Sequence, residues 1–246
     1  MQRHAQHGHE IPRYGAAGAL TPVFRDRQEA GQRLADQLAR LSLPDPVVLA
    51  LPRGGVPVAA EIARKLAAPL DLMIVRKVGA PGNPELAVAA IVDGNPPDVV
   101  RNREIVEAYR LDDAEVAALV AQERPELERR RRAYRGDRQP LSVTGRTAIV
   151  VDDGAATGTT MKVALRALKR RSPRELVVAL PVAPPETAAE LAHEADRVVC
   201  LERPSRFRAL GYYYMSFPQL ADEEVTETLR AIQGERRAQG GSPRRT

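Results

Sequence analysis

The chain has 246 residues, of which 43% are hydrophobic and 4% aromatic, and its formal net charge at pH 7 is +5. This length and composition suit one large α/β domain with short appendages. No run of about 18 apolar residues could cross a membrane, the start lacks the apolar core of a signal peptide, and the single cysteine, Cys200, excludes an internal disulfide, so we expect a cytoplasmic protein.

Residues 1–20 are rich in His, Gly and Ala and predict a disordered tail, residues 21–233 a folded domain, and residues 234–246 a second disordered tail. Within the domain, stretches with apolar residues at helical spacing alternate with short apolar runs. The predicted helices cover residues 24–38, 56–66, 112–135, 159–169, 184–194 and 221–233. The predicted strands cover residues 47–51, 70–75, 87–92, 98–101, 147–151, 176–180 and 197–201.

Repeated strand–helix units with short connections predict the α/β fold class, with a central, mostly parallel β-sheet flanked by helices on both faces. Ligands of such sheets bind at the carboxyl ends of the strands. Three segments with chemistry-bearing residues follow strands at such ends: residues 51–57, 76–85 and 152–160.

The segment 147–160 joins an apolar strand, an acidic pair and a Thr/Gly-rich loop that opens a helix: Thr147-Ala-Ile-Val-Val-Asp-Asp-Gly-Ala-Ala-Thr-Gly-Thr-Thr160. Backbone amides at a helix start suit a phosphate, and the helix N-terminus adds about half a unit of positive charge. Asp152 and Asp153 could accept hydrogen bonds from vicinal ribose hydroxyls, directly or beside a Mg²⁺. An ordinary N-capped helix explains an Asp pair, but it does not explain the acids and the Thr-Gly-Thr-Thr loop together.

The segment Leu51-Pro-Arg-Gly-Gly-Val-Pro57 follows the first sheet strand. Two glycines let backbone amides approach an anion closely, and Arg53 supplies a forked donor. The alternative is an ordinary turn, since Pro-Arg-Gly-Gly also occurs there.

A mobile loop is predicted for residues 76–85, because two glycines and two prolines are expected to preclude regular structure there. Arg76 and Lys77 open this loop and could contact a pyrophosphate. A rigid connecting loop is the alternative, and the role of Glu85 stays open.

Five of the nine aromatic residues lie in residues 203–217. A flat base could stack on such rings, which contributes about 1–3 kcal/mol per base. The alternative is that the rings pack the C-terminal helix onto the sheet. The stacking candidates are Phe207, Tyr212, Tyr213 and Tyr214.

Arginine supplies 33 of the 37 basic residues, and four of them form the run 129–132 in the long helix. A basic chain could bind nucleic acid, but acids are interspersed near this run and no helix-turn-helix or RNA-binding motif is recognisable. A solvated helix face or a dimer contact is the better interpretation. A substrate with several phosphates would also favour a positive field around its cleft.

The run Ala148–Thr160 resembles the signature of the type I phosphoribosyltransferases, which use 5-phosphoribosyl-1-pyrophosphate (PRPP). Residues 52–55 are similar to the pyrophosphate-binding loop of that family, residues 76–85 to its flexible loop, and residues 203–220 to its small C-terminal hood. With an Asp-Glu-Glu-Val at 222–225, the chain resembles a poorly characterised bacterial branch of the superfamily.

The resemblance implies a Mg²⁺-dependent transfer of the phosphoribosyl group of PRPP to a nucleobase-like acceptor, with release of pyrophosphate. Asp152 and Asp153 would be catalytic and hold the ribose hydroxyls, while Mg²⁺ would bridge ribose and pyrophosphate oxygens near them. A homodimer fits the habit of the family. The 5-phosphate would bind to Ala156, Thr157, Gly158, Thr159 and Thr160, and the pyrophosphate to Arg53, Gly54 and Gly55.

Two further expectations come from the family. Its pyrophosphate loop often carries a non-proline cis peptide bond, which we expect at Arg53–Gly54. Its 6-oxopurine enzymes have an Asp immediately before the Thr-Gly pair, where this chain has Ala156, which disfavours a hypoxanthine or guanine acceptor handled in that way.

Two other functions fit the same motifs. One is a regulatory protein that senses PRPP or a nucleotide and binds nucleic acid through its arginines. The other is a phosphorolytic or hydrolytic cleavage of nucleotides at the same site.

Overall fold

The computed structural model of the chain describes residues 22–94 and 96–240. The predicted N-terminal tail, residues 1–20, lies outside the described residues, as do residues 241–246 of the predicted C-terminal tail. In the part that is described, no helix is both long enough and apolar enough to span a membrane.

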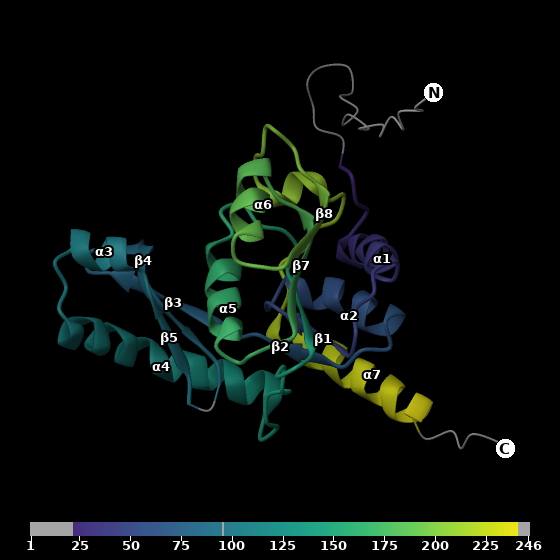
Figure 1. Cartoon of the computed structure of the whole chain (residues 1–246), viewed down its shortest axis with the longest axis horizontal. Helices are drawn as coiled ribbons and strands as arrows, with labels where there is room; N and C mark the ends of the chain where they lie inside the picture. Colours follow the sequence, from purple (N-terminus) through teal and green to yellow (C-terminus); the bar gives the residue numbers. More distant parts are fainter. Residues whose placement is uncertain (1–21, 95, 241–246) are drawn as a thin grey trace, which may run out of the picture.

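Five parallel strands form the central sheet in the order β2-β1-β6-β7-β8 (Figure 1). Ala50 of β1 pairs with Val151 of β6, so these two strands end side by side in the middle of the sheet. This sheet, with helices on both faces, confirms the predicted fold class. The strands are β1 (Pro46–Ala50), β2 (Leu70–Leu72), β6 (Thr147–Val151), β7 (Glu175–Val182) and β8 (Arg197–Glu202).

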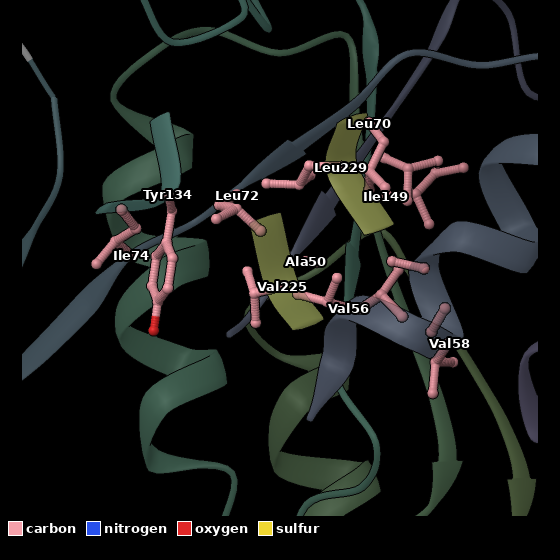
Figure 2. Close-up of a cluster of buried hydrophobic side chains, with 14 of the residues drawn as sticks. Ala50, Val56, Val58, Leu70, Leu72, Ile74, Tyr134, Ile149, Val225 and Leu229 are labelled. Carbon is pink, nitrogen blue, oxygen red and sulfur yellow. The ribbon is translucent and has the colours of Figure 1, made fainter. Parts of the chain in front are cut away.

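Two hydrophobic clusters cover the two faces of the sheet, because successive side chains of a strand point to opposite sides. In β1, Ala50 belongs to a cluster with residues of α1, α2 and α7, and Figure 2 shows it beside Val56 and Val225. Its neighbour Leu49 belongs to the cluster that contains the apolar face of α5 and Leu191 of α6. The helices are α1 (Arg27–Leu38), α2 (Gly55–Lys65), α5 (Thr159–Lys169), α6 (Pro185–Ala192) and α7 (Asp222–Gly240).

A second, antiparallel sheet projects from one side of the central sheet, and we call residues 75–135 the arm (Figure 1). One face of this sheet packs on α4, through residues such as Val78 and Ile91. The other face turns toward α5, through residues such as Val92 and Val100. The arm contains β3 (Val75–Ala80), β4 (Asn83–Val92), β5 (Asp98–Arg101), α3 (Arg103–Ala108) and α4 (Asp113–Arg135).

The expectation that residues 76–85 have no regular structure was wrong. They form most of β3 and the first part of β4, with only residues 81–82 between the strands. The pairing shifts register at Val78/Gly79 and at Gly79/Ala80, so the glycine and proline residues are accommodated in an irregular part of the ladder. The predicted strand 70–75 is likewise divided, because Leu70–Leu72 joins the central sheet and Val75 begins the arm.

A buried arginine fastens the base of the arm to the central sheet. The guanidinium of Arg135, at the end of α4, forms an ion pair with Asp93 and donates to the carbonyl oxygen of Leu72 at 2.9 Å. Asp93 is only 3% exposed. A buried charge requires a partner, so this pair fixes where α4 meets the end of β2.

The C-terminal helix is longer than predicted. The apolar pattern predicts its end at Gln233, whereas α7 continues to Gly240. Arg64 of α2 forms an ion pair with Glu235 at 3.0 Å, a tertiary contact in the extra turns that the pattern of apolar residues does not contain.

Candidate active site

The acidic pair and the Thr/Gly-rich loop lie at the carboxyl end of β6, between the sheet and the start of α5. Gly158 caps the helix with a φ of 65°, a left-handed conformation that favours glycine. Thr187 of α6 donates a hydrogen bond from its hydroxyl to the carbonyl oxygen of Ala156 at 2.7 Å. The loop is therefore held from α6, with its amides at the open end of α5.

A cavity of about 450 Å³ opens at this point. Within residues 22–94 and 96–240, the backbone amides of Thr157 to Thr160 have no hydrogen-bond acceptor, and the hydroxyls of Thr157 and Thr159 lie 3.1 Å apart. Free amides at a helix N-terminus bind anions, so this wall of the cavity suits a phosphate. The cavity is lined by Lys77, Leu86, Ala87, Asn102, Asp152, Gly154, Ala155, Ala156, Thr157, Gly158, Thr159, Thr160 and Met161.

The two aspartates of the signature differ in their surroundings. Asp152 is half-buried and lines the cavity, whereas Asp153 is 7% exposed and does not line it. Burial, and then the charge of Asp153, raise the pKa of Asp152 well above that of an ordinary aspartate. Burial also raises the pKa of Asp153, and the ion pair with Arg27 opposes that shift. Asp152 is thus the carboxylate available to a ligand.

Arg27 is a site residue that the sequence analysis missed. Its Nε lies 2.7 Å from the Asp153 carboxylate, with both side chains about 10% exposed or less. A second nitrogen of Arg27 donates to the carbonyl oxygen of Pro218 at 2.8 Å, and the guanidinium lies 3.8 Å from the centre of the Phe217 ring. Asp153 and Arg27 are 126 residues apart in sequence, and no local pattern indicates such a pair.

The predicted pyrophosphate loop lies beside the acidic pair but outside the 450 Å³ cavity. A Cβ atom on Gly55 would lie 2.6 Å from the carbonyl oxygen of Val151, and one on Gly54 would lie 2.0 Å from an oxygen of Asp153. The side chain of Arg53 is 40% exposed and lies 3.8 Å from Asp222, at the start of α7.

The expected cis peptide bond is one residue away from its predicted position. It joins Pro52 to Arg53 and not Arg53 to Gly54. Gly54 already has helical torsion angles and the amide of Gly55 donates to the carbonyl oxygen of Leu51, so the bond between Arg53 and Gly54 belongs to the first turn of α2. A helical turn is built from trans peptide bonds, so the bond between Arg53 and Gly54 is trans.

Gly54→Ala should lower the free energy of unfolding by about 1–3 kcal/mol, because the added methyl group would overlap the buried Asp153 carboxylate. Denaturant titration measures this change. Gly234→Ala is the matched control, since a Cβ there meets no atom within 4 Å and α7 should gain up to about 1 kcal/mol. A Gly54→Ala protein as stable as the wild type would contradict the close contact.

Arg76 and Lys77 do not share a role, because they point to opposite faces of β3. Arg76 faces α4 and forms an ion pair with Glu123 at 2.6 Å. Lys77 is exposed and lines the same cavity as the loop of Thr157 to Thr160. Of the two predicted loop cations, the structure brings only Lys77 to the site.

The comparison with known proteins agrees with this geometry. The family model of the phosphoribosyl transferase domain matches residues 26–215. The chain belongs to the phosphoribosyl transferase family. This confirms the resemblance drawn from the signature.

Two relatives of this phosphoribosyl transferase domain are informative. The Mycobacterium tuberculosis H37Rv protein named "Putative phosphoribosyl transferase Rv0571c" is 44% identical over 207 residues, which are 84% of this chain and 46% of that protein. The chain therefore spans about half the length of the curated relatives it matches. The crystal structure of TT1426 from Thermus thermophilus is 44% identical, covers 85% of this chain and 98% of that chain, and gives a TM-score of 0.76.

Two of the four aromatic residues predicted to stack on a base are buried in this phosphoribosyl transferase domain, which contradicts that prediction. Tyr214 is 4% exposed and lies between Phe24 and Phe217, with ring centroids at 5.4 and 4.8 Å. Its hydroxyl donates to the carbonyl oxygen of Asp153 at 2.6 Å. Tyr213 is 3% exposed and stacks on the half-buried Phe207. Tyr213 and Tyr214 thus pack the hood onto α1, and only Tyr212, at 53%, is well exposed among the four.

The aspartate side chains at the site would suit a Mg²⁺ ion that binds together with a phosphate-containing substrate. In the described segments, no three His, Cys, Asp or Glu side chains gather into a metal-binding group. Mg²⁺ commonly keeps several waters and is bound by one or two carboxylates together with substrate phosphates. Asp152 on the cavity wall, with Asp153 behind it, offers such carboxylates.

Proposed function

We propose that this protein transfers the 5-phosphoribosyl group of PRPP to a ring nitrogen of a nucleobase-like acceptor and releases pyrophosphate. One observation carries the proposal: the free amides of Thr157 to Thr160 and the carboxylate of Asp152 line the same cavity. A phosphate site and a hydroxyl acceptor in one cavity match the two ends of a ribose 5-phosphate.

The 5-phosphate would bind to the amides of Ala156 to Thr160, helped by the hydroxyls of Thr157, Thr159 and Thr160. The positive end of the α5 dipole favours the same anion. Asp152 would accept hydrogen bonds from the ribose hydroxyls, with Asp153 held behind it by Arg27. Both ends of the sugar are then fixed on one rigid element, the β6–α5 connection.

The chemical step breaks the bond between C1 and the pyrophosphate oxygen, and the electron pair leaves with pyrophosphate. The lone pair of the acceptor nitrogen forms the new bond to C1, and the proton of that nitrogen passes to water. The carboxylate of Asp152 would stabilise the cationic sugar that develops between these events. Mg²⁺, when bound, neutralises charge on the leaving pyrophosphate.

Two sets of residues could hold the pyrophosphate. Arg53, Gly54 and Gly55 lie next to the acidic pair, and Arg53 would exchange its 3.8 Å contact with Asp222 for the ligand. Lys77 faces the phosphate loop from the arm and could neutralise charge from the other side of the cavity. The burial of Tyr213 and Tyr214 leaves Tyr212 as the exposed ring of the hood. Ala156 disfavours a hypoxanthine or guanine acceptor that relies on an Asp at this position.

A product scan tests the proposal. The purified protein is incubated with PRPP, Mg²⁺ and a pool of purine, pyrimidine and pyridine bases, and mass spectrometry searches for a new nucleoside monophosphate. We expect one product, which forms at least about 100-fold more slowly with Asp152→Asn. If no product forms although calorimetry detects PRPP binding, the transferase proposal fails and a PRPP-sensing protein takes its place.

A further inference from the structure

A second cavity, of about 510 Å³, lies between the arm and α5, and we call it the annex. It adjoins the active-site cavity, because Lys77, Ala87, Asn102 and Thr159 line both. Its walls come from β3, β4, β5 and α3 on one side and from α5 on the other. The annex is lined by Lys77, Ala87, Ala89, Ala90, Val100, Arg101, Asn102, Arg103, Glu104, Thr159, Lys162, Val163 and Arg166.

Cations face the annex from both walls. The arm supplies Lys77 and Arg103, and α5 supplies Lys162 and Arg166, against the single acid Glu104 among the described lining residues. Arg101 also belongs to the lining, but strand alternation places its side chain with those of Val78 and Ala89 on the α4 face of the arm sheet. Like charges that converge on one cavity raise its potential, and an anion placed between them relieves the repulsion. The annex is therefore an electrostatic site for an anion with several charges.

The counter-ions of these cations lie outside the annex. Arg166 pairs with Glu194 at 2.7 Å and Lys162 pairs with Glu190, both on the α6 side. In each pair one side chain is half or more exposed, and ion pairs open to solvent contribute little, about 0–1 kcal/mol each, so a phosphate can replace them. Lys77 and Arg103 form no ion pair with any described residue and can meet a ligand directly.

The chemistry of the lining favours phosphates over a single carboxylate. Two arginines, Arg103 and Arg166, offer forked donors, which match phosphate oxygens in pairs. Between the cations lie the small apolar side chains Ala90, Val100 and Val163. This surface suits a flat ring, and the volume lies within the range of small-molecule sites.

We propose that the annex binds a nucleoside polyphosphate, separately from the PRPP cavity and beside it. Its phosphates contact Lys77, Arg103 and Arg166, and its ring lies on the apolar surface between the walls. The site goes beyond the proposed transferase activity, since it requires no chemistry at Asp152. Because Lys77 and Thr159 line both cavities, a ligand in the annex is in position to influence PRPP binding.

Calorimetry with ATP and with inorganic tripolyphosphate, each in the presence of saturating PRPP, tests this proposal. Both probes should bind the wild-type protein, with ATP the tighter because of its ring. Arg103→Glu and Arg166→Glu should each weaken ATP binding about tenfold or more, since each removes a charge-assisted contact. Arg230→Glu, on the exposed face of α7, makes the same charge change and should alter the affinity by less than about twofold.

Three results would overturn the proposal in whole or in part. Equal ATP affinity in Arg103→Glu, Arg166→Glu and wild type would remove the annex as the site. Loss of ATP binding under saturating PRPP would place the polyphosphate on the phosphate loop. Equal affinities of ATP and tripolyphosphate would remove the nucleoside part. Thermal melting confirms that each variant is folded, and the product scan is run without ATP, so failure of the annex leaves the transferase proposal standing.

Discussion

Asp152→Asn should lower the rate of phosphoribosyl transfer by about 10²–10³-fold without unfolding the protein. Asp152 is the signature carboxylate that lines the cavity, next to the amides that would hold the 5-phosphate. The amide of asparagine keeps the shape of the side chain and removes its charge. The loss should therefore appear in kcat, where the cationic sugar develops, more than in the affinity for PRPP.

The same substitution should raise stability near neutral pH. Burial and the charge of Asp153 raise the pKa of Asp152, so the folded state binds this proton more tightly than the unfolded chain does. The free energy of unfolding then falls as the pH rises from the ordinary aspartate pKa through the raised one. Asp152→Asn removes this loss, and denaturant titration of the ligand-free protein at several pH values measures the difference.

Asp137→Asn is the matched control, because Asp137 is exposed at the end of α4 and remote from the cavity lining. It should leave both the rate and the pH profile of stability unchanged. Wild-type turnover in Asp152→Asn would remove Asp152 from the mechanism. A stability that depends on pH in the same way in Asp152→Asn and wild type would contradict the raised pKa.

Arg27→Met should lower the free energy of unfolding by about 3–5 kcal/mol, the range measured when one partner of a buried ion pair is removed. The substitution leaves Asp153 buried without its counter-ion and removes the hydrogen bond to Pro218. Because an unpaired buried carboxylate is protonated more readily, the destabilisation should shrink as the pH falls. Denaturant titration at neutral and at acidic pH measures both effects.

Two variants complete this experiment. Arg25→Met removes an exposed pair with Asp26, in which the arginine side chain is 65% exposed, and should cost less than about 1 kcal/mol. The double variant Arg27→Met/Asp153→Asn removes both charges and should be more stable at neutral pH than Arg27→Met alone. An Arg27→Met protein within about 1 kcal/mol of wild type would show that the pair does not fasten the hood to the signature.

The local structure of the signature could be predicted because it depends on residues that are neighbours in the chain. An apolar strand, two acids and a Thr-Gly-Thr-Thr run in 14 consecutive residues specify a strand end, a tight loop and a helix start. The predicted helix 159–169 coincides with α5, and the regular alternation of strands and helices was sufficient for the parallel sheet. These features depend on spacing within a segment, which the sequence displays directly.

The arm was predicted less well. Glycine and proline at 79–84 suggested a loop, yet β3, β4 and β5 pair in chain order and α4 packs on one face of their sheet, which stabilises strands there. Once β3 is known to be a strand, alternation separates Arg76 from Lys77. The tertiary contacts that create the strand therefore also decide which cation reaches the cavity.

The amino-acid sequence by itself determined the fold class, the Thr/Gly-rich loop at a helix start and the presence of two adjacent carboxylates, because each follows from residues that are neighbours in the chain. Only the tertiary structure decided that Arg27 forms an ion pair with Asp153 and that Asp152 lines the cavity. It also decided that Tyr214 packs between Phe24 and Phe217. The Arg27–Asp153 and Phe24–Tyr214 contacts join residues more than 100 positions apart. The free energy of such contacts depends on a three-dimensional arrangement that no local pattern contains.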